Sequence, residues 1–129
     1  MQGKKIMEKE DKVIKTHKDL DAWKESYKLV LNVYKIVSKF PEYEKYSISS
    51  QIRRAVISIP SNIAEGAARK GDKEFIYHLY VSLGSLAELD TQLLLAKDLS
   101  YHEDDKIFDN IKKVRSIILG LIKYLKNKG

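Results

Sequence analysis

The sequence predicts an all-α protein, an antiparallel up-down bundle of four helices, and three observations lead to this prediction. Along four segments, apolar residues recur at steps of three and four, which is the spacing of one helix face. The 129 residues contain only 2 Pro and 6 Gly, too few for the many turns of a β-sandwich or barrel. The connections between the segments are short, which favours antiparallel neighbours.

The region before the first helix differs from the rest. Residues 1–18 are polar and lysine-rich, and we expect a flexible charged arm there, followed by one bundle domain over residues 19–129. The arm lacks the apolar stretch of a secretory signal. The longest run without a charged side chain, 75–87, is shorter than the roughly 20 apolar residues that span a bilayer. With 0 Cys, these features predict a soluble, cytoplasmic protein that does not enter a membrane.

The first helix is expected to begin near Asp19 or Asp21, since either aspartate suits the N-cap position. It ends at Phe40, because the residue before Pro41 is pushed out of the helical region. Steps of four and three define its expected core stripe, which consists of Trp23, Tyr27, Val30, Tyr34 and Val37.

The second helix is expected to begin after Ser47, a suitable N-cap, and to run to about Arg69. Pro60 lies inside it, lacks an amide hydrogen and crowds the preceding turn. We therefore expect helix two to be kinked at Pro60 or split in two there. The expected core stripe consists of Ile48, Ile52, Ala55, Ile59 and Ile63.

The third helix is expected to begin at the N-cap Asp72, and the fourth to begin in an acidic cluster and end among lysines. Both ends of the fourth helix thus complement the helix dipole. The third core stripe consists of Phe75, Leu79, Ser82, Leu86, Leu89 and Leu93. The fourth consists of Ile107, Ile111, Val114, Ile118, Leu121 and Leu125.

The net charge of +6 is unevenly distributed, because the third helix is acidic overall and the other segments are basic. This asymmetry favours an anionic partner such as RNA or DNA, although a solvated lysine-rich surface gives the same totals. The guanidinium group of an arginine can donate two hydrogen bonds to one phosphate. The alternative role for each of these arginines is a salt bridge with a surface carboxylate. The candidate nucleic-acid-binding residues are Arg53, Arg54, Arg69, Lys70, Lys112, Lys113 and Arg115.

A stripe of polar residues follows the second and third helices, and it allows two interpretations. It is either the solvent-facing side or a hydrogen-bonded network at the seam of these helices or at a subunit interface. The apolar neighbours of the stripe favour the network. Its expected members are Asn62, Glu65, Ser85 and Glu88. In the network, Glu88→Ala would cost about 1–3 kcal/mol, and on a solvent face about 0.5 kcal/mol or less.

The sequence contains no pattern typical of an enzyme. With 0 Cys, thiolate chemistry and cysteine zinc sites are excluded. A di-iron bundle needs a Glu-x-x-His pair on each of two helices, whereas Glu74 and His78 are four apart and occur once. A strand-turn-helix context for a serine nucleophile is missing, as is a phosphate-binding glycine loop. We therefore predict no catalytic site, metal or cofactor.

Two sequence motifs resemble a known family. Residues 51–66 read QIRRAVISIPSNIAEG and residues 84–89 read GSLAEL, and both are similar to motifs of the bacterial four-helix bundle proteins described from 23S rRNA intervening sequences. The residues LDAW at 20–23 and the pair Phe40-Pro41 fit the same family. The resemblance covers about 19–126.

This resemblance implies a ring-shaped homopentamer. Relatives of the family include the accessory protein of diversity-generating retroelements, which binds nucleic acid and a reverse transcriptase. The resemblance also implies that Asn62, Glu65, Ser85 and Glu88 form a shared polar core. The leading hypothesis is a non-enzymatic, oligomeric bundle that binds nucleic acid or serves a ribonucleoprotein or retroelement. The alternative is a protein-interaction scaffold that does not bind nucleic acid.

Overall fold

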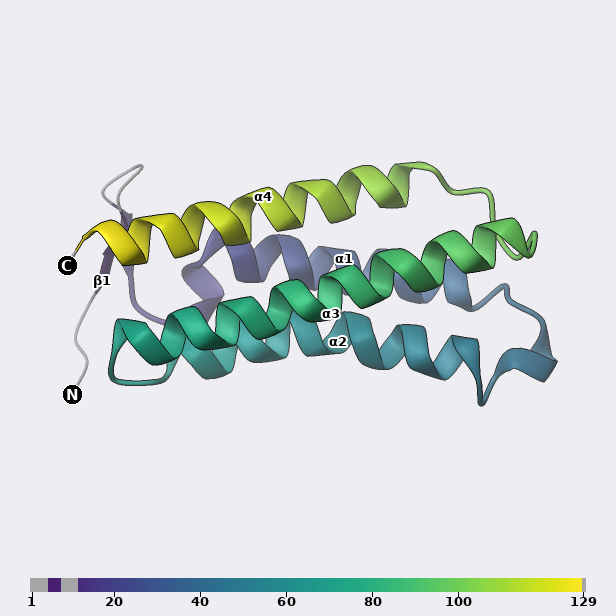
Figure 1. Cartoon of the computed structure of the whole chain (residues 1–129), viewed down its shortest axis with the longest axis horizontal. Helices are drawn as coiled ribbons and strands as arrows, with labels where there is room; N and C mark the ends of the chain where they lie inside the picture. The colour runs from purple at the N-terminus through teal and green to yellow at the C-terminus, as the bar shows by residue number, and fades with distance from the viewer. Residues whose placement is uncertain (1–4, 8–11, 129) are drawn as a thin grey trace.

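Four long helices lie side by side in a single bundle (Figure 1). The computed structural model describes residues 5–7 and 12–128. In Figure 1 the chain reverses direction at each connection, so that consecutive helices run antiparallel. The predicted four-helix bundle is confirmed. The helices are α1 (Asp21–Val37), α2 (Ile48–Ala67), α3 (Asp72–Asp98) and α4 (Lys106–Asn127).

Shorter elements lie before α1 and between the helices. The strands β1 (Lys5–Met7) and β2 (Lys12–Ile14) pair antiparallel, with Ile6 opposite Val13. The sequence analysis did not predict this pairing within its flexible arm. Of that arm, residues 1–4 and 8–11 lie outside the described residues, and its flexibility stays a prediction. Two single 3-10 turns complete the fold, η1 (His17–Asp19) and η2 (Glu42–Glu44).

The core stripes predicted for α3 and α4 are buried in full, and that of α2 is buried apart from the half-exposed Ile48. The α2–α3 pair packs especially closely at Gly66. A Cβ built on Gly66 would lie 2.7 Å from Cβ of His78 and 3.0 Å from Cδ1 of Phe75. Because neither atom is the far end of a flexible side chain, glycine is required for this approach of the two helices.

The core stripe predicted for α1 is wrong in part, since Trp23 and Val30 pack against the core only partly buried and its two tyrosines are exposed. The side chains that α1 buries are Ala22, Ser26, Leu29, Val33, Ile36 and Val37. Of the predicted stripe, only Val37 is fully buried, while Tyr27 and Tyr34 are exposed. Both stripes have helical spacing, so the spacing alone does not separate them. The aliphatic side packs inward, and the tyrosines keep their hydroxyl ends in water.

Several helix ends differ in detail from the prediction. Ser47 stands at the N-cap position of α2, but its hydroxyl donates to Glu44 instead of accepting from the first turn. Gly71 is the N-cap of α3, and Asp72 is its first residue. Leu20 is the N-cap of α1, so neither predicted aspartate caps it: Asp21 is its first residue, and the carboxylate of Asp19 accepts from the amides of Lys15 and Thr16 in the capping box of η1.

Helix α2 continues through Pro60 as one helix, so the expected alternative of a split in two is not found. Pro60 is buried, and next to it the hydroxyl of Ser82 on α3 donates to the carbonyl oxygen of Ile59 at 2.9 Å. This bond gives the backbone beside the proline a partner from the neighbouring helix. A kink of the helix axis at Pro60 stays a prediction.

Candidate nucleic-acid interface

The structure does not bring the predicted cationic residues together into one patch. Arg53 and Arg54 lie in the first half of α2, whereas Arg69 and Lys70 lie beyond its other end. The remaining candidates, Lys112, Lys113 and Arg115, lie in the middle of α4. The side chains therefore come from three separate segments, within or just after α2 and within α4, and do not form one continuous motif.

Ion pairs neutralise part of this set. The guanidinium of Arg69 lies 2.7 Å from the carboxylate of Glu65 and 3.9 Å from that of Glu74. The ammonium of Lys113 lies 3.4 Å from the carboxylate of Glu25. Exposed pairs of this kind contribute little stability, but they reduce the positive charge available to an anionic ligand.

Arg53 is half-buried, and its guanidinium donates to the carbonyl oxygen of Lys45 at 3.4 Å. Arg54 and Lys70 are exposed, and neither forms an ion pair with any residue that the structure describes. Of the two adjacent arginines, Arg54 is therefore the more accessible to an anion.

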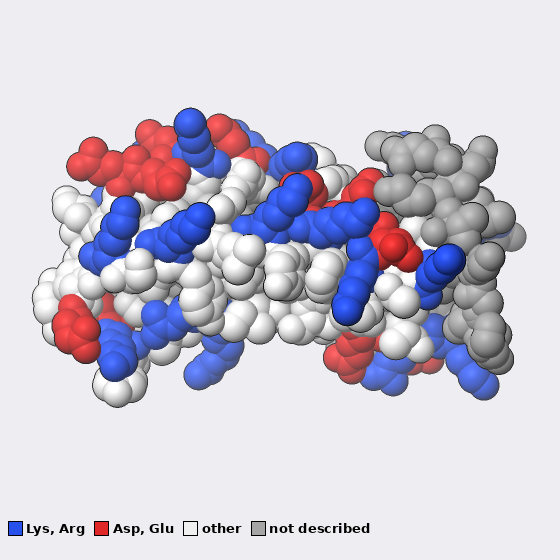
Figure 2. Space-filling view, turned by 180° about the vertical axis from the view of Figure 1, so that it is seen from behind, with Lys and Arg blue, Asp and Glu red and all other residues white. Residues whose placement is uncertain are grey.

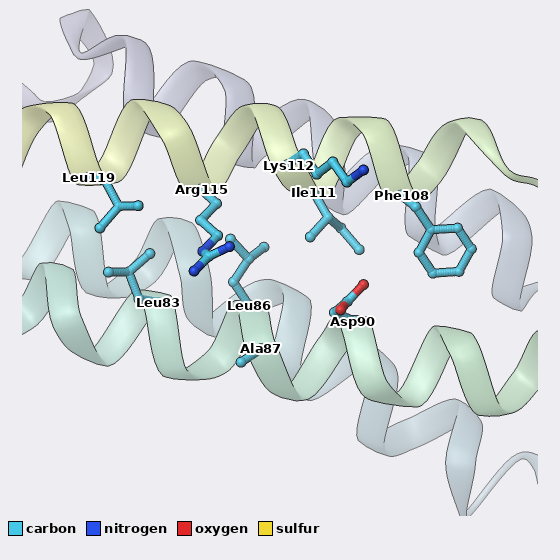
Figure 3. A pocket seen from close by; sticks show the side chains of 9 residues that line it. All are labelled: Leu83, Leu86, Ala87, Asp90, Phe108, Ile111, Lys112, Arg115 and Leu119. Atoms are coloured by element: carbon cyan, nitrogen blue, oxygen red, sulfur yellow. The ribbon is translucent and has the colours of Figure 1, made fainter.

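Lys112 and Arg115 line a groove between α3 and α4 (Figure 3). Its volume is about 380 Å³. Figure 3 shows Arg115 extending from α4 across the groove toward α3. Most of the lining is apolar, so the groove suits the side chains of a protein better than a phosphate. The lining residues are Leu83, Leu86, Ala87, Asp90, Phe108, Ile111, Lys112, Arg115 and Leu119.

A second groove, between α1 and α4, was not predicted from the sequence. Its volume is about 430 Å³, and its lining includes Lys35 of α1, Lys39 just after the end of α1, and Lys106 of α4. None of these lysines forms an ion pair within residues 5–7 and 12–128. We call this cavity the α1–α4 groove. Its lining residues are Asn32, Lys35, Ile36, Lys39, Asp104, Lys106, Ile107 and Asn110.

The α1 surface around this groove is rich in lysine. Lys24, Lys28 and Lys35 follow steps of four and seven, so they lie along one side of α1, and Lys39 follows just after its end. Figure 2 shows the molecule from the side on which α1 lies, with lysine and arginine side chains along most of its length. This spacing was present in the sequence and could have indicated the surface.

Aromatic and polar side chains gather where α1 ends and α4 begins. The hydroxyl of Tyr101 donates to the carboxylate of Glu44 at 2.6 Å, and the hydroxyl of Ser47 donates to the same carboxylate. These hydrogen bonds lower the pKa of Glu44 and raise the pKa of Tyr101. They join the α1–α2 connection to the α3–α4 connection. In the same α1–α2 connection, the residues Tyr43 and Tyr46 are 78% and 87% exposed.

The α3–α4 connection is held by His102. Its Nε2 lies 2.9 Å from the carbonyl oxygen of Leu93, and the amide of Asp104 donates to its Nδ1. The imidazole hydrogen therefore lies on Nε2. The ring stacks on Phe40 and lies near Phe108. His102 thus joins the α3–α4 connection to the end of α3, to Phe40 and to the first turn of α4.

The predicted polar network is partly present at the α2–α3 seam. The hydroxyls of Ser58 and Ser85 lie 2.6 Å apart. The side-chain amide of Asn62 donates to the carbonyl oxygen of Ser58, and its oxygen lies 3.2 Å from Nδ1 of His78. Asn62 and Ser85 therefore contribute to one seam, together with Ser58 and His78.

Glu65 and Glu88 lie outside this seam. Both side chains are exposed in the single chain, so neither belongs to a buried network inside the bundle. Glu65 pairs with Arg69, and Glu88 accepts from the side-chain amide of Gln92 at 3.2 Å. Their expected place at a subunit interface stays a prediction.

Two further properties of the described residues bear on function. Within residues 5–7 and 12–128, no group of three or more His, Cys, Asp or Glu side chains could hold a metal ion. In the same part of the chain, no helix is long and apolar enough to cross a membrane.

One of the comparisons with known proteins shows the family. A comparison with curated proteins finds no match. Among solved structures, the chain is similar to a protein with unknown function from the S23 ribosomal protein family of Bacteroides thetaiotaomicron. The two chains are 21% identical with a TM-score of 0.72, over 79% of this chain and 95% of that one, which shows a shared fold. The family model for the 23S rRNA-intervening sequence protein matches residues 18–123. The chain belongs to the 23S rRNA-intervening sequence protein family.

Proposed function

We propose that this protein is a non-enzymatic, oligomeric helical bundle that binds RNA or DNA through the phosphate backbone. The observation that supports this proposal most is the α1–α4 groove, whose lysines Lys35, Lys39 and Lys106 are not neutralised by ion pairs among the described residues. The net charge of +6 adds a long-range attraction for polyanions. We place this activity in the cytoplasm.

Binding to phosphates predicts a strong dependence on salt and little dependence on sequence. We expect a gel-shift series to detect binding at low salt to at least one of duplex DNA, single-stranded DNA and structured RNA. The binding should weaken as salt rises, because bound phosphates release their counterions. If none of the three shifts at low salt while the oligomer is intact, the nucleic-acid function is contradicted. The protein-interaction scaffold then becomes the better explanation.

Self-association is the second part of the proposal. Large apolar side chains are exposed on α1 and α3, and the α3–α4 groove offers an apolar cavity beside them. Such surfaces are typical of protein interfaces. The exposed side chains are Tyr27, Leu31 and Tyr34 on α1, and Tyr77, Tyr80, Leu94 and Leu95 on α3.

We expect light scattering at micromolar concentration to give a particle several times the chain mass of 14.9 kDa. The family resemblance favours a homopentamer. A ring would also multiply a weak patch on each subunit, so that nucleic acid binds well only to the assembled protein. A particle of the single-chain mass would contradict this prediction. A reverse transcriptase is a further partner that the resemblance implies, and co-purification with one would test it.

A further inference from the structure

We propose that the end of the bundle where α1 ends and α4 begins binds single-stranded nucleic acid. The lysines Lys35, Lys39 and Lys106 hold phosphates, and the rings of Tyr43 and Tyr46 stack on bases. This inference rests on the proposed nucleic-acid function and specifies both the site and the form of the ligand. Tyrosine and lysine together are the combination that proteins use for single strands.

The lysines of the groove come from two parts of the chain. Lys35 lies in the last turn of α1, and Lys39 follows two residues after the helix ends at Val37. Lys106 approaches the same groove from α4, and the side-chain amides of Asn32 and Asn110 add hydrogen-bond donors. Three ammonium groups around one cavity thus face a ligand that carries several negative charges.

Asp104 is the one carboxylate in the lining of the α1–α4 groove, and its charge is already partly balanced. Its Oδ1 accepts from the backbone amide of Ile107 in the first turn of α4, where the helix dipole favours a negative charge. Close to the groove, Asp105 is paired with Lys97 at 2.5 Å. The groove therefore keeps a positive charge.

The tyrosines lie close to these lysines along the chain. Tyr43 follows Lys39 by four residues, so their Cα atoms are at most about 14 Å apart. Tyr46 is more exposed than any other large hydrophobic residue that the structure describes, and Lys45 lies 5.6 Å from its ring centroid. The hydroxyl of Tyr43 lies 3.4 Å from that of Tyr101, which holds one edge of its ring.

The exposed rings distinguish single strands from duplexes. In a duplex the base faces are stacked on one another and are not available to a side chain. In a single strand each base offers a face, and stacking on an aromatic ring contributes without regard to sequence. Tyr43 and Tyr46 should therefore strengthen the binding of single strands and not that of the matched duplex.

The test measures fluorescence anisotropy of a labelled single-stranded RNA, a single-stranded DNA and the matched duplex, with the full-length protein. We expect Tyr43→Ala/Tyr46→Ala to weaken single-strand binding about tenfold or more and to leave duplex binding nearly unchanged. Tyr43→Phe/Tyr46→Phe should bind like the original protein, because the ring is kept. The control is Ile57→Ala, which removes a 43% exposed apolar side chain of α2 that lies outside the surface proposed for self-association.

The lysines are tested with matched triple variants. We expect Lys35→Gln/Lys39→Gln/Lys106→Gln to weaken the binding of every nucleic acid and to reduce the salt slope on single strands by about 2. The control, Lys18→Gln/Lys73→Gln/Lys123→Gln, removes as many exposed charges at the other end and should change binding much less. Circular dichroism and light scattering establish that each variant keeps its fold and assembly.

The outcomes separate this inference from the proposed function. If the original protein binds none of the nucleic acids, the proposed function itself fails. If it binds them, but the tyrosine and lysine variants bind as tightly as their controls, the site is wrong and nucleic-acid binding stands. Equal weakening of duplex and single-strand binding by the tyrosine variant would overturn the stacking role.

Discussion

Leu29→Ala is expected to lower the free energy of unfolding by about 2–5 kcal/mol. Leu29 is 1% exposed on α1, so the substitution removes a fully packed side chain and leaves a cavity. The same substitution two residues later, Leu31→Ala, removes a side chain that is 51% exposed and should cost about 0.5 kcal/mol or less in the isolated bundle.

The pair tests which side of α1 faces the core. Urea denaturation at fixed protein concentration measures the stability, and light scattering follows assembly separately because Leu31 lies on the surface proposed for self-association. If Leu31→Ala costs as much as Leu29→Ala while the assembly is unchanged, the inward side of α1 is assigned wrongly.

Asn62→Ala is expected to cost about 1–3 kcal/mol, because it leaves polar groups of the α2–α3 seam without their partner. The Asn62 side chain bonds to Ser58 on its own helix and to His78 on α3. By contrast, Glu88→Ala should lower the free energy of unfolding by about 1 kcal/mol or less, since Glu88 is exposed in the single chain and loses one hydrogen bond, from Gln92 on its own helix.

This expectation for Glu88 reverses the one drawn from the sequence, where its apolar neighbours favoured burial. Thermal and denaturant unfolding of both variants distinguish the two residues. A cost of more than 1 kcal/mol for Glu88→Ala, with weakened assembly, would place Glu88 at a subunit interface. If both variants lower the free energy of unfolding by the same small amount, the stabilising role of Asn62 at the α2–α3 seam is contradicted.

The helices were predictable because their apolar residues are arranged on one side. In α4, the apolar residues from Ile107 to Leu125 lie on one side of the helix and charged residues lie on the other. Only one side of α4 can therefore face the core. Helix α1 carries two adjacent apolar stripes, and the choice between them depends on which side α2 and α4 cover. That is a tertiary property, and the spacing of Tyr27 and Tyr34 does not contain it.

The candidate site was less predictable than the fold. Adjacent arginines such as Arg53 and Arg54 attract attention in a sequence, yet the structure uses Arg53 to bind the carbonyl oxygen of Lys45. The α1–α4 groove joins Lys35 and Lys39 to Lys106, which is distant in the sequence. Only the packing of the first helix against the last brings these lysines together.

The exposure of Tyr43 and Tyr46 also depends on the tertiary structure. Both lie in the connection that the sequence placed between the first two helices, where an aromatic ring is either packed on the bundle or left in water. The hydrogen bonds from Tyr101 and Ser47 to Glu44 fix this connection with both rings outward.

The dependence of single-strand affinity on salt concentration tests the central claim most directly. If three lysines of the α1–α4 groove each neutralise one phosphate, the logarithm of the binding constant should fall with the logarithm of salt concentration with a slope of about −2 per subunit engaged. Fluorescence anisotropy of the assembled protein with a labelled single-stranded RNA measures this slope. A slope near zero, or no binding at low salt by an intact oligomer, would contradict the claim.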